Sequence, residues 1–115
     1  MQIHLSPRHL TLTAAIHTYV AEKIGHLEEI AGEIIAAHVV LMRDGEANPT
    51  QAYSIKVHLA VPGPDIHAED REAELYPAID RVIDKLAGQL RKRKTKLVDR
   101  SKHKAQKASE RRKRG

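Results

Sequence analysis

The basic side chains of the C-terminal third have types and spacing that suit the binding of phosphates. Arg81, Lys85, Lys92 and Lys96 follow one another at offsets of 0, 4, 11 and 15. At roughly 100° per residue, these positions fall within about 60° of one another on a helix. Cations at fixed spacing on a helix can follow a phosphate backbone and release its counterions. We therefore predict a polyanion-binding stripe beside the apolar face of that helix.

Further cations reinforce the far end of this stripe. The run Arg91-Lys92-Arg93-Lys94 has no acidic residue within four positions on either side. Like charges at this density repel one another, so the run favours an external anion. Asp80 and Asp84 fall on the other flank of the helix, where they do not pair directly with the stripe. The alternative is an ordinary solvated helical face.

The charge of the chain is divided unevenly. Residues 1–80 hold five Lys and Arg against twelve Asp and Glu, a net charge of −7. Residues 81–115 hold fifteen against three, a net charge of +12. This asymmetry indicates a polyanionic partner for the C-terminal third, and a merely solvated basic tail is the alternative.

Patterns for catalysis and metal binding are weak. The sequence has no phosphate-binding loop, no dinucleotide motif and no hydrolase or metalloprotease signature. Glu69 and Asp70 could serve a metal-dependent nuclease, and His58 and His67 could face each other across neighbouring strands. No third ligand accompanies the two histidines. We predict no enzyme activity, small-molecule substrate, cofactor or metal.

Composition also bears on the compartment. The 115 residues include no Cys, no Phe and no Trp, and 41% are hydrophobic. No apolar run approaches the roughly 20 residues of a membrane span, and the N-terminus does not resemble a secretory signal. We expect a cytoplasmic protein with an aliphatic core and no membrane partner.

The stripe needs a scaffold, and the sequence predicts one. Apolar residues at spacings of three and four indicate a helix over 14–31, with Thr11 or Thr13 as N-cap and Gly32 as a left-handed C-cap. Alternation, β-branched runs and turn residues indicate four strands, the first ended by Pro7. The strands cover residues 2–6, 34–43, 53–61 and 66–70, and a second helix covers 74–98.

The fold class that follows is α+β, a β-α-β-β-β-α sandwich. Two helices would pack on one face of a four-stranded sheet and leave the other face open. A regulator that binds proteins through this open face is a further alternative. We predict one domain over residues 1–98 and a basic, disordered tail over 99–115, because the tail can bury too little apolar surface.

The scarcity of aromatic residues limits how nucleic acid can be bound. Modules that stack single-stranded bases use exposed aromatic rings. Tyr53 shares the apolar face of its strand and Tyr76 begins a packed helix, so we expect both in the core. Recognition of the backbone and shape of folded RNA fits better, and general binding of structured RNA or DNA is the alternative function.

The segment from Leu75 to Leu97 closely resembles the last helix of bacterial ribosome hibernation-promoting factors and the related ribosome-associated inhibitor. Tyr76, the Ala78-Ile79-Asp80 and Ile83-Asp84-Lys85-Leu86 runs and the alternating Lys92, Lys94 and Lys96 carry the match. The start of the chain and Ile66-His67-Ala68 agree as well, so the likeness covers about residues 1–98.

The resemblance implies a function without catalysis. Such proteins bind 16S rRNA of the small ribosomal subunit in the channel for mRNA and the A- and P-site tRNAs, and keep ribosomes idle under stress or in stationary phase. By position in the family, Lys85, Lys92, Lys94 and Lys96 contact rRNA, with Lys23 assisting from the first helix. The charge argument adds Arg81 and Arg91.

Two departures from the family matter. Related short members often carry basic residues where this chain has His17, His26 and Gly88, so protonation of the two histidines could restore charge on the first helix. Long members add a dimerisation domain, and in its place this sequence has only the basic segment of about seventeen residues, 99–115. Pairing of ribosomes would then need a second hibernation factor.

Overall fold

The computed structural model describes residues 1–46 and 48–109, with side chains described as far as residue 93. Its strands are β1 (Gln2–Arg8), β2 (Ala36–Arg43), β3 (Tyr53–Ala60) and β4 (Ile66–Glu72), and its helices are α1 (Ala14–Ala31) and α2 (Leu75–Ser109). The predicted element order is confirmed. Within the described part of the chain, no helix is long and apolar enough to cross a membrane.

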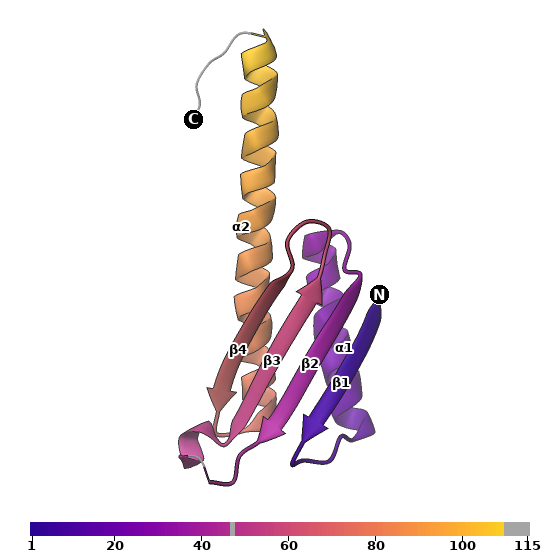
Figure 1. Cartoon of the computed structure of the whole chain (residues 1–115), viewed down its shortest axis with the longest axis vertical. Helices are drawn as coiled ribbons and strands as arrows, with labels where there is room; N and C mark the ends of the chain where they lie inside the picture. The colour runs from indigo at the N-terminus through magenta and orange to yellow at the C-terminus, as the bar shows by residue number, and fades with distance from the viewer. Residues whose placement is uncertain (47, 110–115) are drawn as a thin grey trace.

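One mixed sheet organises the molecule. Its strand order is β1-β2-β3-β4, with β1 parallel to β2 and the other neighbours antiparallel. Figure 1 shows α1 and α2 on one face of this sheet, while the other face is uncovered. The predicted two-layer α+β sandwich is therefore confirmed.

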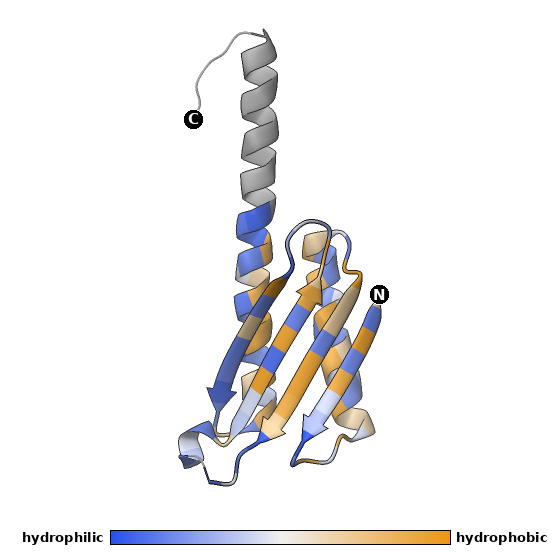
Figure 2. Cartoon of the chain, in the orientation of Figure 1, coloured by the Kyte–Doolittle hydropathy of each residue, from blue (hydrophilic) through white to orange (hydrophobic). Residues whose placement is uncertain are grey.

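The core is aliphatic, as the composition predicts. Every buried hydrophobic residue is Ile, Val, Leu or Ala, contributed by both helices and by the helix-facing positions of the sheet. Figure 2 shows the alternation along β3, where apolar Val57 faces the helices and Lys56 and His58 are exposed on the open face. The core thus fixes which face of each strand is left for partners.

The ends of α1 follow from its capping residues. The hydroxyl of Thr13 accepts a hydrogen bond of 3.2 Å from the backbone N–H of Ile16, so Thr13 rather than Thr11 is the N-cap. Gly32 has φ of 86°, and its N–H donates to the carbonyl of Glu28 at 2.8 Å. A side chain at this φ would be strained, so the position favours glycine.

The prediction that Pro7 ends the first strand is wrong. Pro7 pairs in register with Leu41, and β1 continues to Arg8. Because β1 is an edge strand, one side of its backbone has no partner strand, and a proline is tolerated there. β4 is also longer than predicted and includes Glu72.

α2 continues beyond its predicted end at Val98, as far as Ser109. The predicted end of the helix at about Val98 is therefore wrong. No Gly or Pro follows Gly88 before Ser109, and Lys, Arg, Gln and Ala all favour a helix, so nothing in the sequence terminates it. Residues 110–115 lie outside the described residues, and the division into a domain of 1–98 and a tail stays a prediction.

Candidate nucleic-acid interface

α2 positions six of the seven side chains predicted to contact RNA. Its buried face, which includes Ile79, Val82, Leu86 and Leu90, packs on the sheet and on α1. The predicted stripe lies beside this face, so Arg81 and Lys85 are at the rim of the domain, next to β4. The helical wheel therefore predicts the place of these two cations correctly.

The surroundings of Arg81 and Lys85 differ from the expectation of an unpaired stripe. The Nε of Arg81 lies 3.0 Å from Oδ2 of Asp70 and 3.0 Å from Oε2 of Glu72. The Nζ of Lys85 lies 3.3 Å from the same Asp70 oxygen and donates to the carbonyl of Glu69 at 2.9 Å. Asp80 and Asp84 do not pair with the stripe, as predicted, but β4 supplies the carboxylates instead.

Asp70 is the centre of this cluster. Its side chain is 14% exposed, and partial burial by itself raises the pKa of the carboxyl. Hydrogen bonds from Arg81, from the backbone N–H of Arg71 and from Lys85 outweigh that effect, and the pKa of Asp70 is lowered. Asp70 therefore stays ionised and neutralises the nearest cations of α2.

The same helix face covers the open edge of β4. Lys85 donates to the carbonyl of Glu69, Gln89 donates to the carbonyl of His67 at 2.9 Å, and Arg93 donates to the carbonyls of Pro62 and Pro64. These donors recur at every fourth residue of α2. Unpaired strand edges invite association with other chains, so this ladder has a structural role.

The cations that come next along α2, Arg91 and Lys92, are not paired in this way. Arg91 and Lys92 are exposed, and among the side chains described they form no hydrogen bond or ion pair. Both lie past the level at which Asp70 and Glu72 can reach α2. Lys94 and Lys96 belong to α2, but their side chains lie outside those described. The unpaired cations among the described side chains of α2 therefore lie in the middle of the helix, past the two cations that the β4 carboxylates neutralise.

Lys23 lies on the other flank of α2. Its Nζ is 3.7 Å from Oδ1 of Asp80 and 5.2 Å from the centre of the Tyr19 ring. The Tyr19 hydroxyl donates to the same Asp80 oxygen at 2.5 Å, and this bond raises the pKa of Tyr19 to about 12. Lys23 thus belongs to a cluster that joins α1 to α2.

The expectation that Tyr76 lies in the core is wrong. Tyr76 is 41% exposed, and its ring meets that of Tyr19 edge to face at 4.8 Å between centroids. It stands in the first turn of α2, where its neighbour is the surface of α1 rather than the sheet. Tyr53 is partly buried against the core. Helical spacing alone did not reveal this exposed aromatic side chain beside Tyr19.

The alternative chemical sites are not assembled. Glu69 and Asp70 are neighbours in a strand, so they point to opposite faces, and Asp70 is held by Arg81 and Lys85. His58 and His67 do face each other, with 6.4 Å between ring centroids. No group of three potential ligands forms a metal site among the described residues.

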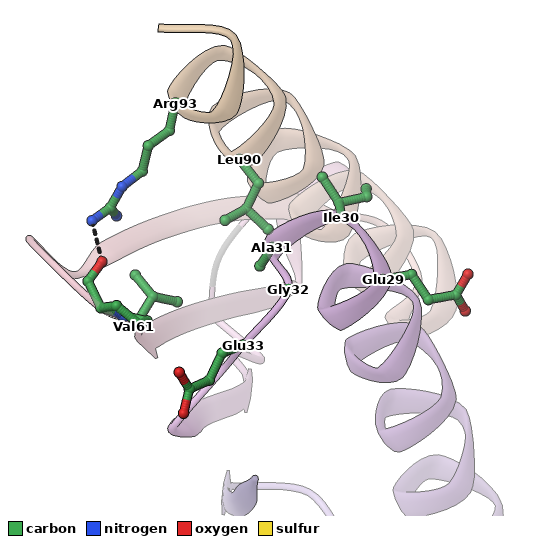
Figure 3. Close-up of a pocket in the computed structure, with 9 residues that line it drawn as sticks. Glu29, Ile30, Ala31, Gly32, Glu33, Val61, Leu90 and Arg93 are labelled. Atoms are coloured by element: carbon green, nitrogen blue, oxygen red, sulfur yellow. Dashed lines mark hydrogen bonds between the residues drawn. The ribbon is translucent and has the colours of Figure 1, made fainter. Parts of the chain in front are cut away.

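A pocket of about 290 Å³ opens between the end of α1, β3 and α2. Figure 3 shows Leu90 and Val61 on its walls, with Arg93 reaching across from α2. The two carboxylates at its rim, Glu29 and Glu33, point away from each other. The pocket is mainly apolar and brings no pair of acid and base groups together.

The fold and the cationic end of α2 define a small α+β protein with a charge distribution typical of polyanion binders. Comparison with known proteins makes the class specific. The family model described as "Sigma 54 modulation protein / S30EA ribosomal protein" matches residues 3–98. The chain belongs to this family.

Individual relatives agree with the family match. The chain is 39% identical over 99 residues to a ribosome hibernation promotion factor of Deinococcus radiodurans, covering 85% of this chain and 52% of that protein. It is 35% identical over 97 residues to the ribosome hibernation promoting factor of Escherichia coli, covering 84% of this chain and 97% of that protein. The chain thus spans about half of the first relative and nearly all of the second.

The fold has a solved counterpart in the N-terminal domain of Thermus thermophilus Protein Y. The TM-score is 0.69 with 31% identity, and the match covers 80% of this chain and 98% of that domain. The shared architecture agrees with the sandwich described above.

Proposed function

We propose that this chain is a cytoplasmic ribosome hibernation factor that binds 16S rRNA of the small ribosomal subunit. In this proposal it occupies the channel for mRNA and the A- and P-site tRNAs, and inhibits translation under stress or in stationary phase. The names of the relatives support the hibernation role. A second hibernation factor as a partner for the pairing of ribosomes stays a prediction.

The exposed cations in the middle of α2, together with the basic run that continues from them, carry the proposal. Arg91 and Lys92 have no partner among the described side chains, and Lys94 and Lys96 continue the basic run. An exposed and unpaired cation can approach a phosphate without first losing an internal ion pair. The acidic remainder of the chain is repelled by RNA, which favours binding by this end.

Arg81, Lys85 and Lys23 take a secondary part in the proposal. Each is already near a carboxylate, so contact with rRNA requires exchange of that partner or sharing of the cation. All three side chains are at least partly exposed, so rRNA can reach them for such an exchange. Their direct contact with rRNA stays a prediction.

Sedimentation with purified small subunits tests the proposal. Wild-type chain should co-sediment at low salt and should be displaced by tRNA and mRNA bound in the decoding channel. Lys92→Glu should weaken binding at least tenfold, because a cation at the interface becomes an anion. Arg43→Glu changes the net charge equally at the opposite end of the sheet and should leave binding unchanged.

Competition separates this function from general nucleic-acid binding. A hibernation factor should retain its affinity for small subunits in the presence of excess random RNA or DNA duplex. Equal competition by duplex and by subunits would instead support the general binder. Binding that persists after subunit rRNA is digested would point to a protein partner and contradict the proposal.

A further inference from the structure

Each strand of the sheet places one histidine in the same row of the open face. His4 is in register with His38, His38 with His58, and His58 with His67. Neighbouring strands lie about 4.8 Å apart, so the row crosses the sheet over roughly 14 Å. The strand register brings together residues that are as many as 63 positions apart in the sequence.

The imidazoles of this row are close to one another and open to solvent. The rings of His4 and His38 stack with 4.8 Å between centroids and 14° between planes. Those of His58 and His67 stack with 6.4 Å and 6°. All four residues are exposed. Protonation of the row would therefore create a dense line of positive charge at the surface.

The charged groups on the open face around the row are of both signs. Arg8 on β1, Lys56 on β3 and Arg71 on β4 point to the same open face, since they are an even number of residues from the histidines. Glu69 on β4 is opposite Lys56 in register, and β2 adds no charged side chain to this face between its ends.

One further carboxylate touches the row. Nε2 of His58 lies 2.9 Å from Oδ2 of Asp65 in the β3–β4 loop. The hydrogen bond with His58 lowers the pKa of Asp65, so this carboxylate remains ionised over the range in which imidazoles gain their charge. Asp65 contacts only His58, and the other three imidazoles have no carboxylate partner among the described residues.

A metal site fits these observations less well. No three ligands converge among the described residues, and stacked rings do not direct their nitrogens to a common point. His58 already has a carboxylate partner. A line of four exposed imidazoles, each able to gain a positive charge, instead suits an extended polyanion.

We propose that the histidine row is a second RNA-binding surface, which engages phosphates when its imidazoles are protonated and so tightens ribosome binding as the pH falls. This inference rests on the proposed function, because a protein that fills a channel walled by rRNA has RNA on the sheet side as well as on the helix side. The row then responds to acidification, whereas the Arg and Lys side chains of α2 act at every physiological pH.

The expected size of the effect follows from proton linkage. Each imidazole that must be protonated in the complex increases affinity by up to about tenfold per pH unit. Phosphates bound along the row would attract every protonated imidazole. Wild-type affinity for small subunits should therefore rise at least about tenfold from pH 7.5 to pH 6.0.

The experiment measures the Kd for small subunits at both pH values and at constant salt. His4→Gln/His38→Gln/His58→Gln/His67→Gln should bind like wild type at pH 7.5 and gain less than about threefold at pH 6.0. His17→Gln/His26→Gln tests the rival source of the response, because protonation of these exposed histidines could add charge to α1, and the proposal expects this variant to keep the wild-type response. Loss of the response in the α1 variant alone, or a full response in the row variant, would overturn the proposal.

Folding and the two proposals can be separated. Thermal unfolding at both pH values shows whether the row variant is folded. If it unfolds at a clearly lower temperature than wild type, His4→Gln/His38→Gln, which alters only one stacked pair, is used in its place. Equal wild-type binding at the two pH values would reject the histidine row and leave the proposed function standing. No wild-type binding at pH 7.5 together with row-dependent binding at pH 6.0 would reject α2 as the main site and support the row.

Discussion

Two pairs of cations on α2, Arg81 with Lys85 and Arg91 with Lys92, have the same chemistry and different surroundings. Arg81 and Lys85 lie beside β4, where Asp70 and Glu72 neutralise them. Arg91 and Lys92 lie further along, beyond the reach of these carboxylates, and have no partner among the described side chains. The comparison shows that basic residues along one helix can serve two purposes. Some cover the edge of a sheet, and others remain exposed as unpaired positive charges.

The largest expected effect concerns the salt dependence of binding. If about four cations contact phosphates, the slope of log affinity against log salt is about −3 to −4. An increase from 50 to 200 mM salt should then weaken binding to small subunits about 100-fold. Filter binding or analytical sedimentation across this range measures the slope, and a flat response would reject an electrostatic interface.

Variants in which these cations are replaced by neutral residues test whether the paired and the unpaired cations of α2 differ in RNA binding. Arg91→Gln/Lys92→Gln should reduce the slope by about two, since each lost phosphate contact removes roughly one. Arg81→Gln/Lys85→Gln should leave the slope nearly unchanged, because their charge is already neutralised within the protein. Equal slopes for the two double variants would show that the β4 carboxylates release their cations to RNA.

Replacing Asp70 should lower the stability of the protein and strengthen the electrostatic part of RNA binding. Asp70→Asn removes the partner of Arg81 and Lys85 and should lower the free energy of unfolding by about 1 kcal/mol at pH 7. The released cations should steepen the salt slope. Denaturant unfolding and binding at several salt concentrations measure the two effects, with Asp84→Asn as control because Asp84 has no ion pair among the described residues.

The pH dependence of the Asp70 effect has a definite sign. The folded pKa of Asp70 is lowered, so its stabilising contribution is present above the unfolded value near 4 and is lost as the pH falls through the folded value. Wild type and Asp70→Asn should therefore converge in stability below about pH 4. A difference that persists unchanged at pH 2.5 would contradict the role of ionised Asp70.

The smallest effect concerns the cluster of Lys23 between the helices. The folded pKa of Tyr19 is raised to about 12, so its contribution is present below the unfolded value near 10 and is lost as the pH rises through 12. Tyr19→Phe should lower the free energy of unfolding by about 1 kcal/mol at pH 9 and by less at pH 11.5. Tyr53→Phe, measured in the same way, should show no such pH-dependent difference, since no side-chain hydrogen bond of Tyr53 is described.

Much of the fold could be predicted because its signals are local. The bounds of α1, the glycine at its end and the alternation of β3 depend on residues close in sequence, and all three are confirmed. Pro7 and the far end of α2 were misjudged for local reasons as well. An edge position tolerates a proline, and a polar helix without Gly or Pro has no stop signal.

The electrostatic partners of the site depended on contacts between distant residues. A helical wheel places Arg81 and Lys85 on the correct flank, but their partner Asp70 comes from another element, 11 and 15 positions away. Tyr76 shows the same limit. Its spacing fits the apolar face of α2, but in the first turn of that helix its ring packs against Tyr19 of α1. Pairing across elements is set by register and packing, which no window along the chain contains.

The amino-acid sequence by itself determined the order of elements, the aliphatic core and the concentration of positive charge in the last third, because periodicity and composition act over short distances. Only the tertiary structure decided which cations are neutralised and which are displayed, and only the strand register aligned four separate histidines in one row. Coulomb forces fall off with distance in space rather than along the chain, so the folded arrangement decides how each charge is used.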